Sequence, residues 1–328
     1  MNAFLFSVNA ILPIVLLVVL GYFLKKIGLL KLDLAKGIHR LVFRVFLPVM
    51  LFLNVYKIET FENIGFSFVI YAIGATFLIF ALTLPFVCGL TKDPARRGVL
   101  VQTTFRSNYT LIGITLASAL FPEGNIGAAV ATLLAAFIVP TFNVLAVICL
   151  TVFSKDGGKP SVKKVLLGII KNPLIIGVFV GVIMLGVKLL LRNAGYNIGI
   201  ENIEPVWKTL NNLSASATPI ALIALGAQFE FSDVTKMKKE LIFGVAMRSL
   251  IIPAIGLVGA YLIGQFEGCH FASFVALFCT PLAVSTVPMA QEMGADVTLA
   301  GQLVVWSTIF STFTIFAASV ILKSIGIF

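Results

Sequence analysis

The stretch Phe105-Arg106-Ser107-Asn108-Tyr109-Thr110-Leu111-Ile112-Gly113 decides the fold class, because it places polar side chains inside an apolar run long enough to cross a bilayer. Lipid tails offer no hydrogen-bond partners. A polar interruption at that depth is therefore tolerated only where it faces protein or a water-filled cavity. The sequence predicts a membrane helix that is broken around residues 105–113 and turned toward the interior of the protein.

A second interruption lies in the other half of the chain and reads Cys279-Thr280-Pro281-Leu282-Ala283-Val284-Ser285-Thr286-Val287-Pro288. Pro281 removes a donor and disfavours helical geometry at Thr280, so carbonyl groups near Val275–Leu277 are expected to be free to point at a cavity. Two broken segments at corresponding positions are the best indication in a sequence of a transporter's binding site. We therefore expect the two breaks to meet.

The composition sets the class of protein. Of 328 residues, 59% are apolar and only 12% are charged, and the mean hydropathy is +1.06. Repeated apolar windows of about 20 residues predict a polytopic α-helical membrane protein, since a barrel would show alternating segments of about ten residues. Residues 1–24 resemble a signal peptide in hydrophobicity, but Lys25 and Lys26 follow them and no cleavage site ends them. We expect a retained first helix.

Apolar periodicity and helix breakers predict an all-α fold of ten transmembrane helices. The expected ranges are 3–24, 38–56, 65–90, 96–120, 124–153, 173–193, 205–229, 240–264, 271–291 and 296–325. Most lysines and arginines then fall in the connections on one side of the membrane. This is the distribution of the positive-inside rule, and it predicts that both termini face the outside or the periplasm. The net charge of +10 therefore does not indicate nucleic-acid binding.

The longest polar connection divides the chain into a first five-helix repeat (1–153), a cytoplasmic linker (154–171) and a second five-helix repeat (172–328). An odd number of helices per half requires the second half to be inverted relative to the first. Leu47-Pro48-Val49-Met50 resembles Thr218-Pro219-Ile220-Ala221, although these prolines could equally be independent kinks. We predict two inverted repeats in which the broken helices four and nine cross.

Arg106 is a fixed cation near the middle of the membrane, and its planar fork matches a carboxylate. The alternative is a structural arginine that pairs with an acid or a carbonyl, or that extends to the cytoplasmic surface. The predicted substrate-binding residues are those of the two breaks and of two paired helices: Arg106, Ser107, Asn108, Tyr109, Thr110, Thr280, Pro281, Ser285, Asn54 and Gln228. Gln291 and Glu292, which close the second break, are candidates for binding a coupling cation.

Other kinds of chemistry have little support. Cys88, Cys149, Cys269 and Cys279 are scattered without the spacing of a metal or disulfide site, and the two histidines are isolated. No nucleophile–base constellation, Walker loop or dinucleotide fingerprint is present, so we expect no enzyme, no metal and no cofactor. Coupling to protons or sodium stays open. Gly177-Val178-Phe179-Val180-Gly181 suits close helix contact, within the chain or in a homodimer.

Several motifs resemble the auxin efflux carrier family. Residues 105–113 are similar to the F-R-N-N-x-x-x-I-G segment of its bacterial members, and Asn172-Pro173-Leu174-Ile175 is similar to their N-P-L-I segment. Thr280-Pro281 together with Ala290-Gln291-Glu292-Met293-Gly294-Ala295-Asp296 resembles their pattern in helix nine. The family often has a proline just after I-G, where this chain has Ile114-Thr115.

The resemblance implies a fold related to bile-acid sodium symporters and sodium/proton antiporters, in which a mobile unit moves against a scaffold. It also implies transport of organic anions, such as auxin in plant members and malate or malonate in some bacterial ones, and it places Asn108 and Thr280-Pro281 at the substrate site. The sequence thus predicts a secondary carrier of a small mono- or dicarboxylate, in a prokaryotic inner membrane. A cation-coupled antiporter, a bile-acid-type symporter and a membrane receptor remain alternatives.

Overall fold

The computed structural model describes residues 3–57, 66–122, 126–153, 167, 170–230 and 233–327, and these residues form helices and connections. Their only strand-like pairing is an isolated bridge between Ser107 and Leu282. Within the described residues, seven helices or uninterrupted helix runs are long and apolar enough to cross a membrane. The prediction of an all-helical, multi-pass membrane protein is confirmed at this level.

The helices fall into a first and a second half. The first half contains α1 (Ala3–Lys26), α2 (Leu32–Leu41), η1 (Val42–Phe46), α3 (Leu47–Tyr56), α4 (Ser67–Leu90), α5 (Pro94–Phe105), η2 (Tyr109–Gly113), α6 (Ile114–Leu120) and α7 (Ile126–Val152). The second half contains α9 (Pro173–Asn193), η4 (Ile200–Asn202), α10 (Glu204–Gln228), α11 (Asp233–Lys236), α12 (Lys238–Ala246), η5 (Met247–Ile251), α13 (Ile252–Ile263), α14 (Gly268–Cys279), α15 (Thr286–Glu292) and α16 (Val297–Ser324).

The bounds of the described helices differ from the predicted ranges in one respect of substance. The second predicted helix begins at Leu32 rather than at residue 38, so that α2, η1 and α3 form one continuous run. The fourth and ninth are each interrupted, as the polar breaks predict. The predicted linker 154–171 lies mostly outside the described residues. Local chemistry fixes several starts: Asp93, Asn172 and Asp296 accept backbone N–H groups in the first turns of α5, α9 and α16.

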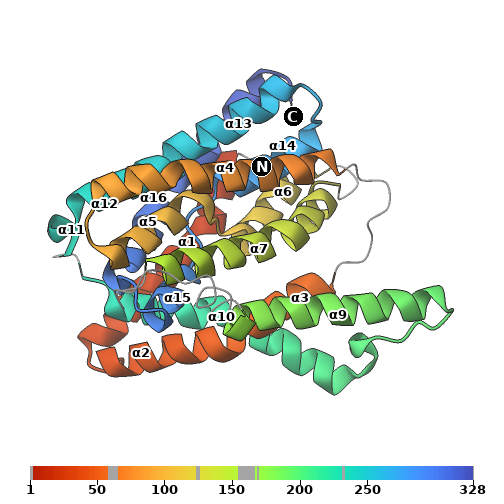
Figure 1. The fold of residues 1–328 in the computed structure, drawn as a ribbon, viewed down its shortest axis with the longest axis horizontal. Helices are drawn as coiled ribbons and strands as arrows, with labels where there is room; N and C mark the ends of the chain where they lie inside the picture. The colour runs from red at the N-terminus through yellow and green to blue at the C-terminus, as the bar shows by residue number, and fades with distance from the viewer. Residues whose placement is uncertain are drawn as a thin grey trace.

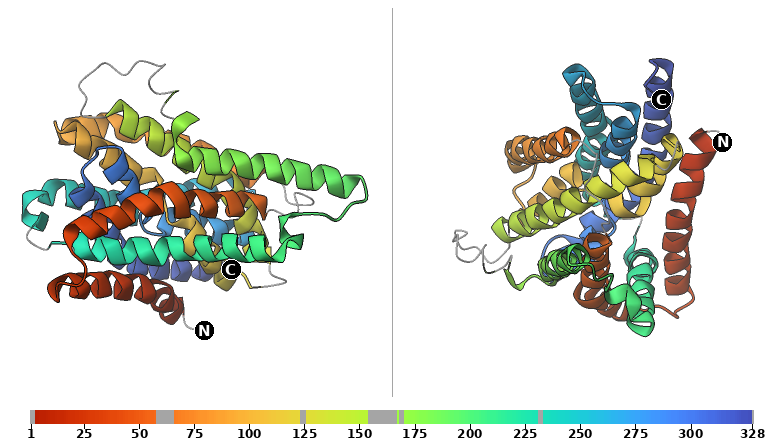
Figure 2. Two further views of the ribbon diagram at one scale, coloured as in Figure 1. Left: turned by 90° about the horizontal axis from the view of Figure 1, so that it is seen from below. Right: turned by 90° about the vertical axis from the view of Figure 1, so that its right-hand side faces the viewer.

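Four elements lie side by side in one row, which we call the helix row: α9, the α2–α3 run, α10 and α1 (Figure 2, left). Glycines allow the backbones to approach. A Cβ at Gly177 of α9 would lie 2.4 Å from the carbonyl oxygen of Pro48 in α3, and one at Gly226 of α10 would lie 2.0 Å from that of Val18 in α1. The small-residue face of α9 is therefore used inside the chain, against α3.

The remaining helices pack beside the helix row as a second group, which we call the broken-helix group: α4, α5–α6, α7, α12–α13, α14–α15 and α16 (Figure 1). Its centre is α14, where the side chains from Phe271 to Cys279 are all buried. α7 runs through the same region, and 67% of its most apolar window is buried. Polar groups of the two breaks are thus held among deeply buried segments of the described helices.

Candidate functional site

The first break follows from the end of α5. The backbone of Arg106 leaves the helix with φ −92° and ψ 104°, and helical geometry resumes only at Tyr109. The intervening residues run antiparallel to the second break through the bridge between Ser107 and Leu282. The N–H of Asn108 donates to the carbonyl of Pro281 at 2.8 Å. Backbone groups that the broken helix leaves free are therefore satisfied by the other break.

The second break follows from proline chemistry. Pro281 has no N–H and disfavours helical geometry in the preceding residue, and α14 accordingly ends at Cys279 with Thr280 extended at φ −72° and ψ 152°. The N–H of Leu282 donates to Ser307 Oγ of α16 at 3.1 Å. The helix resumes at Thr286 as α15. The two breaks therefore meet at a crossing inside the broken-helix group.

A cavity of about 240 Å³ lies between this crossing and the helix row. One side is formed by α3, α9 and α10, and the other by the two breaks and α7. The polar lining consists of Asn54, Arg106, Ser107, Asn108, Tyr109, Thr110, Asn143, Ser214, Thr218 and Ser285, and the apolar lining of Leu47, Met50, Leu51, Val139, Phe142, Leu174, Ala215, Ala217, Ala221, Ala283 and Val284. The cavity thus combines an apolar body with amide, hydroxyl and guanidinium groups.

Arg106 supplies the charge in this lining, and it is only 3% exposed. Its four terminal N–H groups meet neutral acceptors. Nη1 donates to Gln102 Oε1 at 2.8 Å and contacts Met289 Sδ at 3.0 Å, while Nη2 donates to Asn143 Oδ1 at 2.8 Å and Ser285 Oγ at 2.9 Å. Among the described residues, no carboxylate forms an ion pair with it. A buried cation with neutral neighbours favours an anion in the adjoining space.

Four further polar groups of the lining are buried without a hydrogen-bond partner. They are the amide nitrogens of Asn54 and Asn108 and the hydroxyls of Ser107 and Tyr109. A buried polar group left unpaired costs about 1–3 kcal/mol, so such groups call for an explanation. Together with Arg106 they offer donors to a ligand rich in acceptor oxygens, which describes a carboxylate.

The structure brings together most of the residues predicted from sequence. Seven of the ten substrate candidates line the cavity, namely Asn54, Arg106, Ser107, Asn108, Tyr109, Thr110 and Ser285. Thr280 and Pro281 lie at the crossing but outside the lining, where the Pro281 carbonyl holds Asn108. Gln228 lies elsewhere, with its Nε2 2.8 Å from His39 Nδ1 at the contact of α10 with α2.

The expectation for the free carbonyl groups of the second break is wrong. Residues 275–277 do not line the cavity. The carbonyl of Leu277 accepts from Arg248, and that of Ala276 accepts from Thr280 Oγ1. The partner of the Leu277 carbonyl comes from η5, a different part of the chain, so the sequence around Pro281 could not reveal it.

Sequence reasoning also missed part of the site. Asn143 of α7 and Ser214 and Thr218 of α10 line the cavity. Asn143 had one available signal, because it is an amide inside a long apolar helix, where polar residues are costly. Its Nδ2 donates to the carbonyl of Val139, four residues earlier, so that Oδ1 is left to accept from Arg106. Ser214 and Thr218 carry no such signal, since small hydroxyl residues are common in membrane helices.

Gln291 and Glu292 lie at the far end of α15 and contact the helix row. Glu292 accepts from Arg40 at 3.2 Å and from Arg44 at 3.0 Å, and Gln291 Nε2 donates to the carbonyl of Lys36 at 2.8 Å. Neither residue lines the cavity. These contacts join the broken-helix group to α2 and η1 of the helix row, outside the site.

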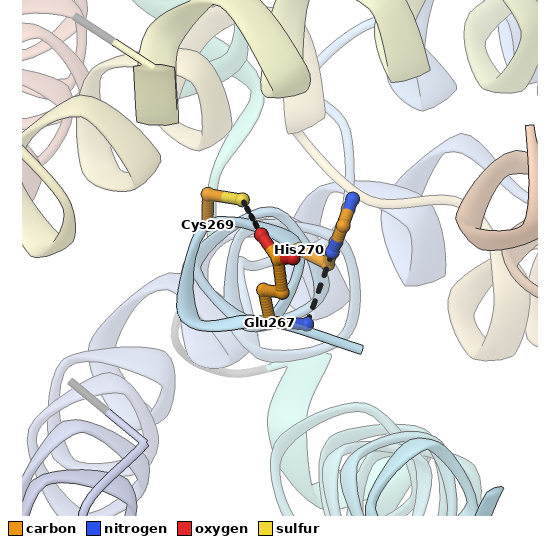
Figure 3. Close-up of side chains that lie close together, drawn as sticks. All are labelled: Glu267, Cys269 and His270. Carbon is orange, nitrogen blue, oxygen red and sulfur yellow. Dashed lines mark hydrogen bonds between the residues drawn. The ribbon is translucent and has the colours of Figure 1, made fainter. Parts of the chain in front are cut away.

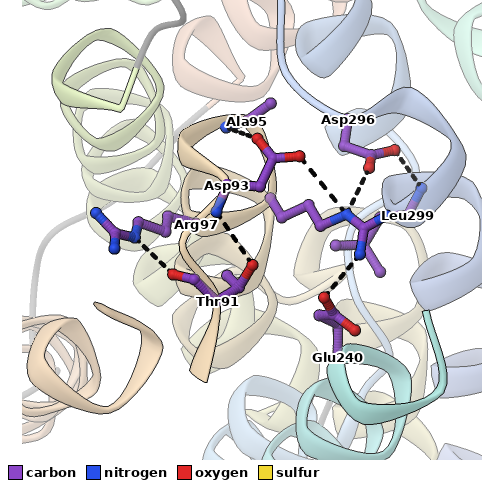
Figure 4. A network of polar contacts seen from close by, with 8 residues as sticks. Thr91, Asp93, Ala95, Arg97, Glu240, Asp296 and Leu299 are labelled. Carbon is purple, nitrogen blue, oxygen red and sulfur yellow. Dashed lines mark hydrogen bonds and ion pairs between the residues drawn. The ribbon is translucent and has the colours of Figure 1, made fainter. Parts of the chain in front are cut away.

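A second ionic cluster, at the ends of α5 and α16 away from the crossing, holds the broken-helix group together (Figure 4). Arg96 contacts Glu240 of α12 at 2.7 Å, Asp296 at 3.2 Å and Asp93 at 3.7 Å. The two aspartates also accept N–H groups at the starts of α5 and α16. Arg96 therefore links the starts of α5 and α16 to α12.

Glu267, Cys269 and His270 gather at the start of α14 (Figure 3). The N–H of Glu267 donates to His270 Nδ1 at 3.1 Å, and the Cys269 Sγ lies 3.9 Å from Glu267 Oε2. His270 also packs against the Phe68 ring. Glu267 and His270 thus cap the start of α14, and Cys269 contacts the Glu267 carboxylate.

Comparison with known proteins decides the family. A model of the family described as "Membrane transport protein" matches residues 6–318 of the chain. The chain belongs to this family. The family is that of the auxin efflux carriers, so the resemblance found in the sequence motifs is confirmed, together with the prediction of a transmembrane transport protein.

Two relatives match almost end to end. An "Uncharacterized transporter" of Methanothermobacter thermautotrophicus is 24% identical over 337 residues, covering 97% of this chain and 99% of the relative. A "Putative malonate transporter" of Rhizobium meliloti is 22% identical over 322 residues, covering 96% of this chain and 95% of the relative.

Proposed function

We propose that the protein is a secondary carrier of a small organic anion, a mono- or dicarboxylate. The observation that carries this proposal is Arg106, whose buried guanidinium faces the cavity with neutral partners alone among the described residues. The unpaired donors of Asn54, Ser107 and Asn108 support it, since a carboxylate supplies the acceptors that they lack. The name of the Rhizobium relative agrees with this class of substrate.

A cation-coupled antiporter is the nearest alternative. Exchange of protons or sodium at the crossing calls for a buried carboxylate, and the described residues that line the cavity include neither aspartate nor glutamate. Glu292 is a nearby acid, but Arg40 and Arg44 already pair with it. The structure thus favours an anion over a cation as the cargo of this cavity.

We propose further that transport follows elevator-like alternating access. The helix row would act as a scaffold, and the broken-helix group would carry Arg106 and the anion past it. This mechanism requires ten membrane crossings in two inverted halves, residues 1–153 and 172–328. It also places both termini on the outer side of a prokaryotic inner membrane. The interruption of the fourth and ninth crossings, at matching positions, supports this reading.

The test is counterflow in proteoliposomes with labelled malonate, malate, lactate and indole-3-acetate, and with alanine as a zwitterionic control. We expect accumulation of at least one carboxylate and none of alanine. Arg106→Gln should abolish it. The matched control Arg97→Ala should not, because the Arg97 guanidinium donates to the carbonyls of Thr91 and Cys88, away from the cavity. Proton- or sodium-driven flux without any carboxylate exchange would instead favour the antiporter.

A further inference from the structure

The arginine of η5, Arg248, is buried deeply inside the broken-helix group. It is 1% exposed, and it lies in the middle of the helix run Lys238–Ile263, which is long enough to cross a membrane. Among the described residues, no carboxylate pairs with it. An unpaired charge at that depth is costly, so its partners must compensate it in another way.

The partners of Arg248 are backbone carbonyl groups. Its Nε donates to Thr280 O at 2.8 Å and its Nη1 to Thr104 O at 3.2 Å. Its Nη2 donates to Leu277 O at 2.8 Å and to Phe278 O at 3.1 Å. A guanidinium can do this because its donors are fixed in a planar fork, whereas an ammonium offers only three donors on one atom.

These four carbonyl groups share one structural property, since they belong to the last turns of α5 and α14 and to the residue just after α14. The last carbonyls of a helix have no N–H partner within that helix, and together they carry roughly half a negative charge. Both broken helices therefore direct their negative ends at the same point. Arg248 supplies the positive charge there.

In transporters built from broken helices, unwound carbonyl groups and the C-terminal ends of half-helices coordinate the coupling sodium ion or proton. We propose that Arg248 is a resident cation that occupies this position permanently. No sodium ion then binds between the ends of α5 and α14, and the anion moves without sodium coupling at the crossing. This goes beyond the proposed function, because it concerns the driving ion, and it can be tested without a known substrate.

The crossing has two different sides. Arg106 lines the cavity, whereas Arg248 does not. The carbonyl groups that could hold a metal ion are already bonded to Arg248, while the donors of Asn54, Ser107 and Asn108 remain unpaired at the cavity. Arg248 thus occupies the position where a cation could bind, whereas the donors that could bind an anion have no partner within the described residues.

The experiment measures thermal unfolding of the purified protein in detergent, in sodium chloride and in N-methyl-D-glucamine chloride of equal ionic strength. We expect the wild-type midpoint to be the same in both salts. Arg248→Ala exposes the carbonyl groups, so its midpoint should fall and then rise saturably by a few degrees as sodium or guanidinium is added, because a ligand that binds only the folded state stabilises it. Arg97→Ala also frees two carbonyls, Thr91 O and Cys88 O, but away from the crossing, and should show no sodium response.

Two further variants keep the test decisive if Arg248→Ala does not fold. Arg248→Lys retains the charge and should remain indifferent to sodium, whereas Arg248→Gln retains donors without the charge and should gain a sodium response. A saturable sodium stabilisation of the wild-type protein would overturn the proposal. A folded Arg248→Ala or Arg248→Gln protein that responds to sodium no more than Arg248→Lys would overturn it as well. Neither result would bear on whether the cavity carries an anion.

Discussion

The contact between α9 and α3 offers the sharpest prediction, because both helices line the cavity through Leu174 and Asn54. A Cβ at Gly177 would lie 2.4 Å from the carbonyl oxygen of Pro48 and 2.9 Å from its Cα. Since van der Waals contact between heavy atoms needs about 3.5 Å, Gly177→Ala must force the helices apart by about 1 Å. Overpacking of this kind costs about 1–3 kcal/mol.

The same helix contains its own control. A Cβ at Gly186 of α9 would meet nothing within 4 Å, so Gly186→Ala should be neutral or stabilise the protein by up to ~1 kcal/mol through its helix propensity. Unfolding can be followed with a thiol-reactive fluorogenic dye, since Cys149, Cys269 and Cys279 are buried, and the signal of the exposed Cys88 in the folded protein is measured as the background. Equal midpoints for the two alanine variants would refute the proposed close contact of α9 with α3.

Three other predictions concern single side chains. Arg106→Lys should keep the positive charge but lose the forked geometry that now reaches Gln102, Asn143 and Ser285, and we expect carboxylate affinity at least tenfold weaker in equilibrium binding, with a lower unfolding midpoint because buried acceptors lose their donors. Glu292→Gln breaks ion pairs with two largely exposed arginines, so it should cost less than ~1 kcal/mol in unfolding yet change the counterflow rate; an unchanged rate would count against a role in movement. Burial alone would raise the pKa of Glu201, but hydrogen bonds from Lys188 and Tyr56 outweigh burial and hold this pKa below its usual value of 4.5. The charged carboxylate therefore stabilises the folded protein, and this contribution should be lost as the pH falls below 4.5. Glu201→Gln should remove that part of the acid sensitivity.

The sequence could predict the helices and the breaks because both follow from local chemistry. Apolar length sets the crossings, and the missing N–H of Pro281 favours the end of α14 at Cys279, although Pro85, Pro140 and Pro219 lie inside continuous helices. It could also predict the polar side of the site, since Arg106 and Asn108 interrupt an apolar helix. It could not predict which helices face the breaks. Nothing in the sequence around Ser214 and Thr218 of α10 marks them as site residues, and only the packing of α10 brings them into the cavity lining together with Arg106.

The two buried arginines show the same limit more clearly. Both lie in apolar helices. The polar break around Arg106 predicts its place at the cavity, but neither sequence context predicts which groups the two guanidinium groups contact. The structure distinguishes them through partners that are remote in sequence, since Arg248 lies 144 residues from Thr104 and Arg106 lies 179 residues from Ser285. Such pairings depend on how the helices pack, and local patterns carry no information about them.

The nature of those partners explains why only Arg106 can exchange them for a ligand. Its acceptors are the side chains of Gln102, Asn143 and Ser285, which can rotate away from the guanidinium. A carboxylate replaces these neutral acceptors with an oppositely charged one that can accept two parallel bonds from the fork, which favours the exchange. The acceptors of Arg248 are backbone carbonyls, which cannot turn away unless α5 and α14 unwind further. One arginine is therefore free to hold an anion while the other keeps the crossing intact.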